Sequence, residues 1–367
     1  MSRRQRILIA SHEASRSGVP RVTVHLTKAL RSAGFETVVS QRWGGPLFDE
    51  MVAAADRSFL EPLAKVRVAL LRSPRTRPIA QRIGDLAVAR VVKRERPDLV
   101  VCNSVMTTRY ARAARSLGIP VMVYSHEAPD VVAHVLANLG ASSWPADPSF
   151  TLVGCSVDTA AEFAGVLQTE PERVDVLTSP VDIAAITAEA ATSPAPAVDG
   201  PYVLGCGRGN DHKGIDVFNA AAEMAREAGR PETWVWVGNV PSDRRTPAVT
   251  YVGEQPSVTP WTAAASVMAL PSRADRFPLV VLEAMALGRP VVASDLTGPR
   301  EQLGDTGVFV PAGDAPALLD AVSALVDDPA TAERLGAAAA ERAASMWDAP
   351  VFAARATALV ERALGLQ

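Results

Sequence analysis

Short apolar runs alternate with longer amphipathic segments along most of the chain. The run RILIA at 6–10 is followed by a segment of helical length, 20–34, and the next apolar run, ETVVS, lies at 36–40. Within 20–34, Val22 and Leu26 fall on one helical face. Strands that are apolar throughout and are joined by helices are typical of a parallel sheet covered on both faces. The pattern predicts an α/β protein.

The alternation occurs twice, which predicts two doubly wound, Rossmann-like domains. The strands predicted in the first half are 6–10, 36–40, 97–104, 120–127, 151–156 and 173–180. Those predicted in the second half are 202–207, 233–239, 249–254, 266–272, 290–295 and 307–311. The helices expected with them include 20–34, 106–117, 157–168, 213–228 and 278–287. Ligands of such sheets bind beyond the carboxyl ends of the strands, and two such domains facing each other would enclose a cleft.

The alternation breaks in a stretch rich in Ala and Pro. We predict an interdomain linker at 184–198, with an N-terminal domain at 1–183 and a C-terminal domain at 199–347. The length of 367 residues agrees with two domains of roughly 100–200 residues each.

Composition and charge narrow the class of partner. Hydrophobic residues make up 48% of the chain and charged residues 21%, which is ordinary for globular proteins. The net charge of −3 argues against a general polyanion binder, so no nucleic acid is expected. The segment 61–97 is an exception, with ten Lys or Arg against three acids. It is either a solvated helical face or a patch for an anionic lipid or an anionic acceptor.

Cysteine usage and hydropathy indicate a compartment. Cys102, Cys155 and Cys206 each lie in or beside a predicted strand without metal-ligand spacing, which is typical of buried thiols in a reducing compartment. The first apolar run, 7–10, is too short for a signal peptide. No stretch reaches the roughly 18 apolar residues of a membrane span. We therefore expect a soluble cytoplasmic protein.

The stretch GCGRGNDHKGID at 205–216 follows a predicted strand and opens a predicted helix. Glycines let a backbone approach a ligand closely, and a helix N-terminus favours an anion. Arg208 and Lys213 add two cations, so one interpretation is a diphosphate site. The other is a glycine-rich turn with surface cations. A dinucleotide fingerprint would need glycine at Asn210, and a Walker loop would need lysine at Ile215.

The stretch ADRFPLVVLEAMALGRPVVAS at 274–294 carries two acids, Asp275 and Glu283, in apolar surroundings. Pro278 suits the first turn of a helix and Gly288 suits its end, so Glu283 falls in the second turn. A buried carboxylate requires hydrogen-bond partners, and ligand hydroxyls would serve because a carboxylate accepts two of them. The alternative is that Asp275 caps the helix and that Glu283 pairs with an arginine.

Together these segments resemble the family 4 retaining glycosyltransferases of the GT-B fold, over nearly the whole chain. The similar motifs are the E-x7-E region with the residues after it at 271–314, the diphosphate loop at 207–214, the first loop and helix at 15–39, the strand-end His motif at 124–129, and a closing helix after a Trp at 346–364. The resemblance implies an acceptor-binding N-terminal domain, to which the closing helix 348–367 returns, and a donor-binding C-terminal domain.

The resemblance also implies roles for single residues. Glu283 would accept hydrogen bonds from the donor ribose, and Asp275 would contact sugar hydroxyls. Arg208 and Lys213 would neutralise the leaving diphosphate, and His126 would lie near the sugar and the acceptor. The segment Val252 to Gln255 would pass the nucleobase. The residues implied to contact the donor are Gly18, Gly207, Arg208, Lys213, Val252, Gly253, Glu254, Asp275, Phe277, Pro278, Leu279, Val280 and Glu283.

Three positions and one segment depart from the family pattern. The segment is VLTSPVD at 176–182, where the family often has a Pro-Asn-Gly-Val-Asp run. Asp275 stands where the family has Glu, so its carboxylate is one methylene short. Pro278 follows Phe277 where the family often has Gly, which stiffens the loop. Ser17 precedes Gly18 where the family has a second Gly. These differences leave the base and the sugar of the donor open.

The reaction implied is departure of a nucleoside diphosphate from a sugar anomeric carbon, with retained configuration, toward a hydroxyl acceptor. Arg208, Lys213 and a helix dipole would stabilise the charge that builds on the diphosphate. No cofactor is implied, since the nucleotide-sugar is a substrate, and no metal is expected because no D-x-D pair stands in a metal-binding context. An epimerase, an inverting transferase and a non-catalytic nucleotide-sugar-binding homologue are the alternatives on this fold. A dinucleotide oxidoreductase is disfavoured because the glycine fingerprint is missing.

Four further side chains have two interpretations each. Glu127 either orients His126 or caps a helix, with the cap favoured. His12 is either a structural group or part of the site. His212 is expected to be exposed, and Trp347 is expected to pack in a core rather than stack on a ligand.

Overall fold

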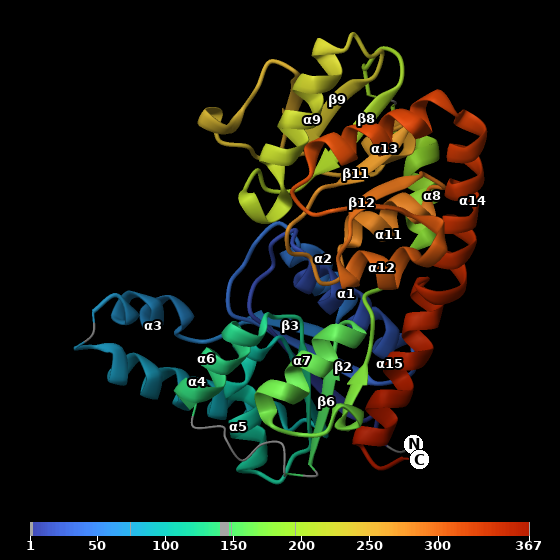
Figure 1. The fold of residues 1–367 in the computed structure, drawn as a ribbon. Helices are drawn as coiled ribbons and strands as arrows, with labels where there is room; N and C mark the ends of the chain where they lie inside the picture. The colour runs from blue at the N-terminus through green and yellow to red at the C-terminus, as the bar shows by residue number, and fades with distance from the viewer. Residues whose placement is uncertain (1–2, 74, 140–146, 148, 195, 367) are drawn as a thin grey trace. The chain divides into compact units, whose positions relative to one another are not determined.

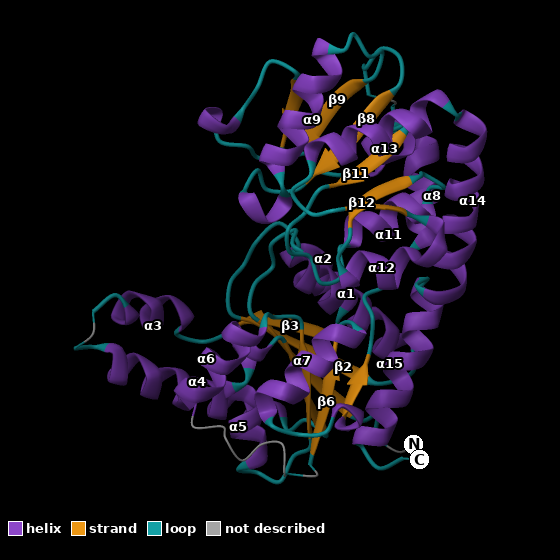
Figure 2. Ribbon diagram, viewed as in Figure 1, coloured by secondary structure: helices purple, strands orange, loops and turns teal. Residues whose placement is uncertain are grey.

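The structure is a computed structural model that describes residues 3–366 except 74, 140–146, 148 and 195. The chain divides into two compact units. Unit 1 comprises Met1–Ser179 with Phe352–Gln367, and unit 2 comprises Pro180–Val351. Each unit combines one parallel sheet with helices on both of its faces (Figures 1 and 2).

Unit 1 contains a seven-stranded parallel sheet in the order β3-β2-β1-β4-β5-β6-β7. Its strands are β1 (Arg6–Ser11), β2 (Glu36–Gln41), β3 (Arg57–Leu60), β4 (Leu99–Asn103), β5 (Val121–Ser125), β6 (Phe150–Gly154) and β7 (Val174–Val176). Its helices are α1 (Gly18–Ser32), α2 (Phe48–Ala54), α3 (Ala64–Leu71), α4 (Arg77–Glu95), α5 (Arg109–Arg115), α6 (Pro129–Leu139), α7 (Val157–Leu167) and most of α15 (Ala349–Ala363).

The central strands of unit 1 are buried on both faces, which is why their sequences are apolar throughout. On one face Leu8 and Ala10 pack against α4, α5, α6 and α7. On the other face Ile7 and Ile9 pack against α1 and α15. The C-terminal helix therefore completes the core of unit 1, as the resemblance to the GT-B fold implied.

Unit 2 contains a six-stranded parallel sheet in the order β10-β9-β8-β11-β12-β13. Its strands are β8 (Tyr202–Cys206), β9 (Thr233–Val237), β10 (Val249–Gly253), β11 (Val267–Leu270), β12 (Val291–Ser294) and β13 (Val308–Val310). Its helices are α8 (Ile183–Thr192), α9 (Ile215–Glu227), α10 (Thr259–Ala264), α11 (Leu279–Ala286), α12 (Thr297–Leu303), α13 (Ala315–Asp327) and α14 (Pro329–Met346).

The sheet of unit 2 is also covered on both faces. One core joins the strands to α11 and α14, and it includes Trp347, whose ring lies edge-on to Phe277 at 5.3 Å. The other core joins the strands to α9 and α13 around Trp234 and Trp236. Trp347 is a packing residue, as expected. Cys102, Cys155 and Cys206 are buried free thiols, also as expected.

The linker predicted at 184–198 is wrong for most of its length. Residues Ile183–Thr192 form α8, because the Asp182 side chain accepts a hydrogen bond from Ala185 N at 3.0 Å and caps the helix. Ile183 and Ile186 pack against the core of unit 2. The segment is apolar because one helical face is partly buried. Residue 195, within the predicted linker, lies outside the described residues.

The strand β3 and the helix α2 had no counterpart among the expected elements. β3 is an edge strand whose residues are half-buried or exposed, so its sequence RSFL lacks the continuous apolar pattern. The basic segment 61–97 forms α3 and α4. None of the helices in the described part of the chain is long and apolar enough to cross a membrane.

Candidate functional site

In unit 2, two loops meet where the strand order reverses. β8 lies between β9 and β11. The chain adds β9 and β10 on one side of β8, and then adds β11, β12 and β13 on the other side. Loop 207–214 follows β8, and loop 271–278 follows β11. Such a reversal opens a crevice at the carboxyl ends of parallel strands, where ligands of doubly wound sheets bind. Both predicted donor motifs therefore fall at the expected edge of the sheet.

Glycines in the first loop fill positions where a side chain would clash. A Cβ atom on Gly209 would lie 2.7 Å from Val240 Cγ1, and one on Gly214 would lie 1.9 Å from the Pro271 carbonyl oxygen. Gly214 also has a φ of +67°, which favours glycine. Gly207 has a φ of +132°, and its carbonyl accepts a hydrogen bond from Trp236 Nε1 at 2.9 Å. The glycines are required by close packing at the end of the sheet.

Lys213 and Asp275 form an ion pair that joins the two loops. Lys213 Nζ lies 2.5 Å from Asp275 Oδ2, and Ser272 Oγ donates to the same oxygen at 3.3 Å. The Lys213 side chain is 30% exposed and that of Asp275 is 13% exposed, so the ammonium reaches solvent beside a mostly buried acid. Asn210 fixes the loop because its side chain accepts from Lys213 N at 3.1 Å. The acid predicted to touch sugar hydroxyls thus also positions the cation predicted to bind phosphate.

A second ion pair braces the same two loops. Arg273 makes a bidentate pair with Asp216, with both N–O distances at 2.6 Å, and its Nη1 donates to the Asp211 carbonyl at 3.1 Å. The His212 carbonyl accepts from Arg273 N at 2.8 Å, while the His212 side chain is exposed, as expected. The Arg208 side chain is exposed, and no ion pair holds it within the part of the chain that the structure describes. It is available to an anion.

Glu283 lies on the predicted helix, and Phe277 lies in the loop just before that helix. α11 begins after Pro278, so Glu283 is half-buried in its second turn between Leu282 and Ala284, which are buried. Gly288 ends the helix with a φ of +64°. The Phe277 ring is buried in the core, so Phe277 could contact a donor only through its backbone. Asp275 does not cap α11, because it binds Lys213 instead.

The segment predicted to pass the nucleobase lies at the end of β10. Val252 and Gly253 are half-buried and Glu254 is exposed. The Gly253 carbonyl accepts from Gly238 N at 2.8 Å, which ties this segment to the end of β9. Leu279 and Val280, at the start of α11, are half-buried. Gly18 begins α1 in unit 1, apart in the sequence from the other donor candidates.

In unit 1, His126 follows β5 and is held by Asn103 at the end of β4. The Asn103 amide donates from Nδ2 to Thr23 Oγ1 at 2.7 Å and to the Val19 carbonyl at 3.2 Å. Its Oδ1 must then be the atom 2.9 Å from His126 Nε2, and it can only accept. Nε2 therefore carries the ring proton, and Nδ1 of the neutral imidazole presents a lone pair. The ring of Tyr124 packs against the imidazole at 4.2 Å.

Burial keeps His126 neutral. Burial, with a smaller contribution from nearby His12, lowers the pKa of His126 to about 3. Burial also lowers the pKa of His12, whose Nδ1 has no hydrogen-bond partner among the described residues. Glu127 accepts from Ser104 Oγ and from Val105 N at 3.3 Å, at the start of a short 3-10 helix. Glu127 Oε2 also accepts from His126 N at 2.9 Å, so Glu127 both caps the short helix and holds the His126 backbone, while Asn103 orients the imidazole ring.

Asn103, Asp216 and Arg273 were missed as site residues. Asn103 ends an apolar strand run, a position at the carboxyl edge that could have marked it. Asp216 and Arg273 pair across 57 residues, and nothing local signals that pairing. Among the described residues, no group of three or more His, Cys, Asp or Glu side chains could hold a metal ion.

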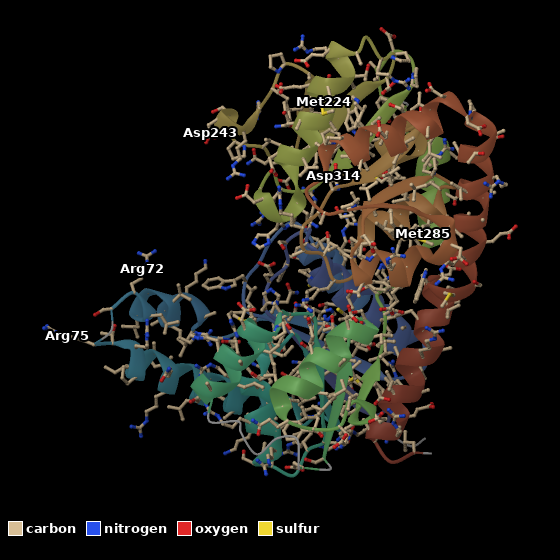
Figure 3. The ribbon with its side chains drawn as sticks, viewed as in Figure 1. Arg72, Arg75, Met224, Asp243, Met285 and Asp314 are labelled. Atoms are coloured by element: carbon tan, nitrogen blue, oxygen red, sulfur yellow. The ribbon has the colours of Figure 1, made fainter. Side chains whose placement is uncertain are left out.

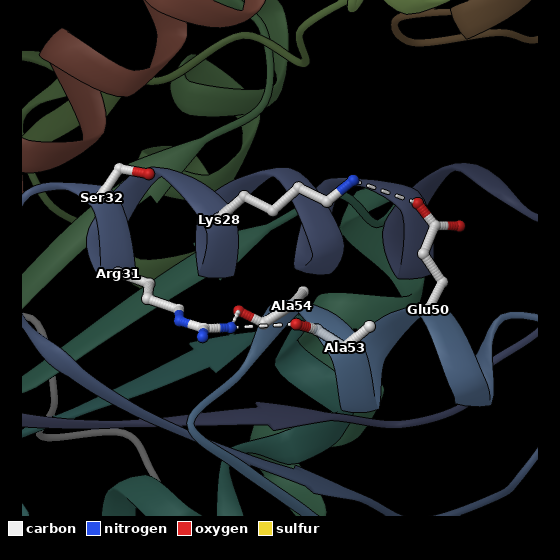
Figure 4. A pocket seen from close by; sticks show the side chains of 6 residues that line it. All are labelled: Lys28, Arg31, Ser32, Glu50, Ala53 and Ala54. Carbon is white, nitrogen blue, oxygen red and sulfur yellow. Dashed lines mark hydrogen bonds and ion pairs between the residues drawn. The ribbon is translucent and has the colours of Figure 1, made fainter.

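A groove in unit 1 of about 490 Å³ does not belong to these sites (Figure 4). It is lined by α1 and α2 through Lys28, Arg31, Ser32, Glu50, Ala53 and Ala54. Its two cations already have partners within the protein, because Lys28 Nζ lies 3.4 Å from Glu50 Oε1 and Arg31 Nη1 donates to the Ala53 carbonyl at 3.0 Å. The Lys28–Ser32 part of α1 lies near its C-terminus, away from the carboxyl ends of the strands.

Two family descriptions match successive parts of the chain. Glycosyltransferase Family 4 matches residues 16–185, and Glycosyl transferases group 1 matches residues 200–328. The chain belongs to the family 4 glycosyltransferases. The first match covers most of unit 1 with His126, and the second covers the loops of unit 2 with Lys213, Asp275 and Glu283.

Curated relatives in this family match over part of their length. A D-inositol 3-phosphate glycosyltransferase of Kribbella flavida is 36% identical over 143 residues, which is 38% of this chain and 30% of the relative. An alpha-D-kanosaminyltransferase of Streptomyces kanamyceticus is 32% identical over 166 residues, 41% of this chain and 42% of the relative. The chain thus spans less than half the length of these relatives.

Solved structures share the fold over nearly all of the chain. A glycosyltransferase of Rickettsia africae superposes with a TM-score of 0.78 at 14% identity, covering 99% of this chain and 100% of that one. Anabaena Alr3699/HepE in complex with UDP and glucose superposes with a TM-score of 0.76 at 18% identity, covering 98% and 100%. The two parallel-sheet units are those of the GT-B fold.

The low pKa of His126 predicts acid sensitivity. An unfolded histidine binds a proton near pH 6.5, whereas the native side chain binds one only near pH 3, so the free energy of unfolding falls as the pH drops between these values. Between pH 7 and 5 the loss from His126 is at most about 2 kcal/mol. His126→Gln should lose less stability over this interval in urea unfolding, and the exposed control His212→Gln should behave as wild type. Equal acid sensitivity of wild type and His126→Gln would contradict the assignment.

Proposed function

We propose that this protein transfers a sugar, with retention of anomeric configuration, from a nucleoside-diphosphate-sugar to a hydroxyl acceptor. The observation that carries the proposal is the pair of loops at the reversal point of unit 2, where exposed Arg208 and half-buried Lys213 flank glycines whose close packing holds the two loops together. Membership of family 4, and the UDP bound in one structure with the same fold, support this assignment.

The loops suit a leaving diphosphate. As the glycosidic bond breaks, negative charge grows on the phosphate oxygens, and cations held in place stabilise that charge more than they stabilise the intact donor. Asp275 and Asn210 hold Lys213 before the donor arrives, so little reorganisation is needed. With Arg208 and Lys213 supplying the positive charge, we propose that the reaction needs no metal ion. Glu283 would accept hydrogen bonds from the donor ribose.

The acceptor chemistry belongs to unit 1 in this proposal. His126 is neutral at physiological pH and offers the Nδ1 lone pair, so it would accept a hydrogen bond from a sugar or acceptor hydroxyl. The relatives named above act, by their names, on different molecules, so acceptor identity is left open in this proposal. Three buried free thiols support a cytoplasmic location in a bacterial cell like those of the relatives.

We further propose peripheral contact with an anionic membrane through α3 and α4. Figure 3 shows Arg72 and Arg75 extending from the end of this helical pair. Arg77 is exposed beside them, and two apolar side chains of this region are also exposed, Leu63 just before α3 at 57% and Ile79 on α4 at 55%. Exposed apolar residues among basic ones are typical of a surface that meets anionic lipid headgroups.

The donor loop is tested by nucleotide binding. UDP, GDP, dTDP and ADP are the nucleotides to compare. For whichever of them binds, Arg208→Ala combined with Lys213→Ala should weaken the affinity by roughly 100-fold, because two charge-assisted contacts are lost. Calorimetric titration measures this, and Arg226→Ala, an exposed cation on α9, is the matched control. Unaltered affinity in the double variant would refute the loop assignment.

Transfer itself is tested at the ribose ligand. Glu283→Gln keeps the volume of the side chain but loses the charge, so kcat/KM should fall by roughly 10- to 100-fold at an unchanged melting temperature. The exposed Glu333→Gln on α14 is the control. The wild-type rate should persist in EDTA. A strict requirement for a divalent ion would contradict the metal-independent mechanism, and donor binding without any transfer would favour a non-catalytic homologue.

Membrane contact is tested by sedimentation with vesicles of phosphatidylcholine and phosphatidylglycerol. Each basic residue near such a surface contributes about 1 kcal/mol, so replacing Arg72, Arg75 and Arg77 by Gln should weaken binding by roughly 100-fold. Arg334→Gln on α14 should bind as wild type. Absence of vesicle binding by the wild-type protein would remove this part of the proposal.

A further inference from the structure

A second charged cluster lies in unit 1 at the ends of β2 and β3. It comprises Arg42, which follows β2, Glu61, which follows β3, and Arg67 on α3. We call these three residues the Arg42 cluster. All three side chains are nearly buried, with exposed fractions of 12% for Arg42, 3% for Glu61 and 6% for Arg67. Buried charges of this kind require partners.

Glu61 does not satisfy both guanidinium groups. Its Oε1 lies 3.1 Å from Arg67 Nη1, which is a direct contact, but its Oε2 lies 4.0 Å from Arg42 Nε. Arg42 Nη2 donates to the Met106 carbonyl at 2.6 Å. The Nε atoms of Arg42 and Arg67 are buried and have no hydrogen-bond partner among the described residues. Two guanidinium groups thus share one carboxylate.

Asp85, which lies near enough to act on Arg67, does not supply the missing negative charge. Arg109 and Arg112 both pair with Asp85, so that acid is already shared. Burial, followed by repulsion from Arg67, lowers the pKa of Arg42 to about 10, although Glu61 opposes the shift. A buried cation without a full partner lowers the stability of the folded state. The Arg42 side chain keeps an exposed fraction of 12%, and the neighbouring Met106 is 38% exposed.

Gly84 on α4 leaves the space that the Arg67 side chain occupies. A Cβ atom at this position would lie 2.8 Å from Arg67 Cδ and 3.0 Å from Nη1. Glycine inside a helix is less stable than alanine by roughly 1 kcal/mol. α4 therefore carries a destabilising residue where the Arg67 side chain passes, and the space is used to bring a second cation beside Arg42.

The Arg42 cluster and His126 lie on the same edge of the sheet. Along that edge the strands run β2, β1, β4 and β5, and the residues after them are Arg42, His12, Ser104 and His126. Three strand spacings of about 4.8 Å separate the backbone positions of Arg42 and His126. His12 lies between them, since its pKa responds to both Glu127 and Arg42. Side chains that reach along the edge bring the two positions within the span of a small molecule.

We propose that Arg42 and Arg67 form a subsite for a phosphate group on the acceptor. Guanidinium groups bind oxyanions through paired N–H donors, and a phosphate would supply the charge and the acceptors that both Nε atoms lack. The inference rests on the proposed function, because it names the class of acceptor for that reaction. It assigns unit 1 an anion site separate from the diphosphate loop of unit 2.

Titration with inorganic phosphate at constant ionic strength tests the subsite. Phosphate should raise the melting temperature of the whole protein, and the variant lacking Arg208 and Lys213 should keep a phosphate response. Arg42→Gln leaves the Glu61–Arg67 pair intact, and it should weaken phosphate binding by roughly 10-fold or more. Gly84→Ala keeps every charge but displaces Arg67, and it should weaken binding as well. Arg90→Gln, an exposed cation on α4, is the control and should bind as wild type.

Stability separates a ligand site from a structural ion cluster. Without phosphate, Arg42→Gln should melt at the wild-type temperature or above it, because a surplus buried cation is removed. A melting temperature lower by several degrees would overturn the inference. Phosphate binding that survives Arg42→Gln but disappears without Arg208 and Lys213 would also overturn it, while leaving the donor loop assignment intact. If phosphate does not change the melting temperature at all, the proposed phosphate subsite is refuted. The donor loop is then tested by the nucleotide titrations alone.

Discussion

The backbone contact at Gly214 is the constraint on which the candidate donor site depends. The loops after β8 and β11 lie so close that only a residue without a side chain fits against the Pro271 carbonyl. This approach places Lys213 beside Asp275 and Arg273 beside Asp216, so two ion pairs form across one seam. Parallel strands whose order reverses at β8 and β11 make the seam possible. The sheet topology therefore determines the electrostatics of the site.

The pairing of Lys213 with Asp275 gives a physical meaning to the shorter acid. A carboxylate that already binds an ammonium group and a hydroxyl has fewer free lone pairs for a sugar. An arriving diphosphate would share the same ammonium group with Asp275, because an ammonium group has three N–H donors. In the proposed reaction, the acid at this position would therefore influence both how tightly the leaving group is held and which sugar hydroxyl can be contacted.

Much of the fold could be predicted from sequence, because central parallel strands are apolar on both faces and leave a continuous signal. The strands around Leu8, Val101 and Val123 are of this kind. The same reasoning failed at β3, an edge strand, and at α8, whose Ala-rich sequence resembles a linker. Local pattern was sufficient for the glycine loop and for α11.

The partners of the site residues could not be predicted in this way. Lys213 and Asp275 are 62 residues apart, and His126 is 23 residues from Asn103. Each pair forms because adjacent parallel strands bring their carboxyl ends together, which depends on the strand order. The Arg42 cluster is a similar case, since a basic segment in the sequence does not distinguish the buried Arg67 from the exposed Arg72.

The position of α15 sets the order in which the protein can be completed during synthesis. Phe352, Ala356 and Val360 fill the face of the unit 1 sheet that α1 covers in part. These residues are made only after unit 2, although the rest of unit 1 is made before it. A nascent chain would therefore expose an apolar strip beside α1 until residues 352–360 have been made, and chain termination before residue 352 would leave that strip permanently open to chaperones or to aggregation.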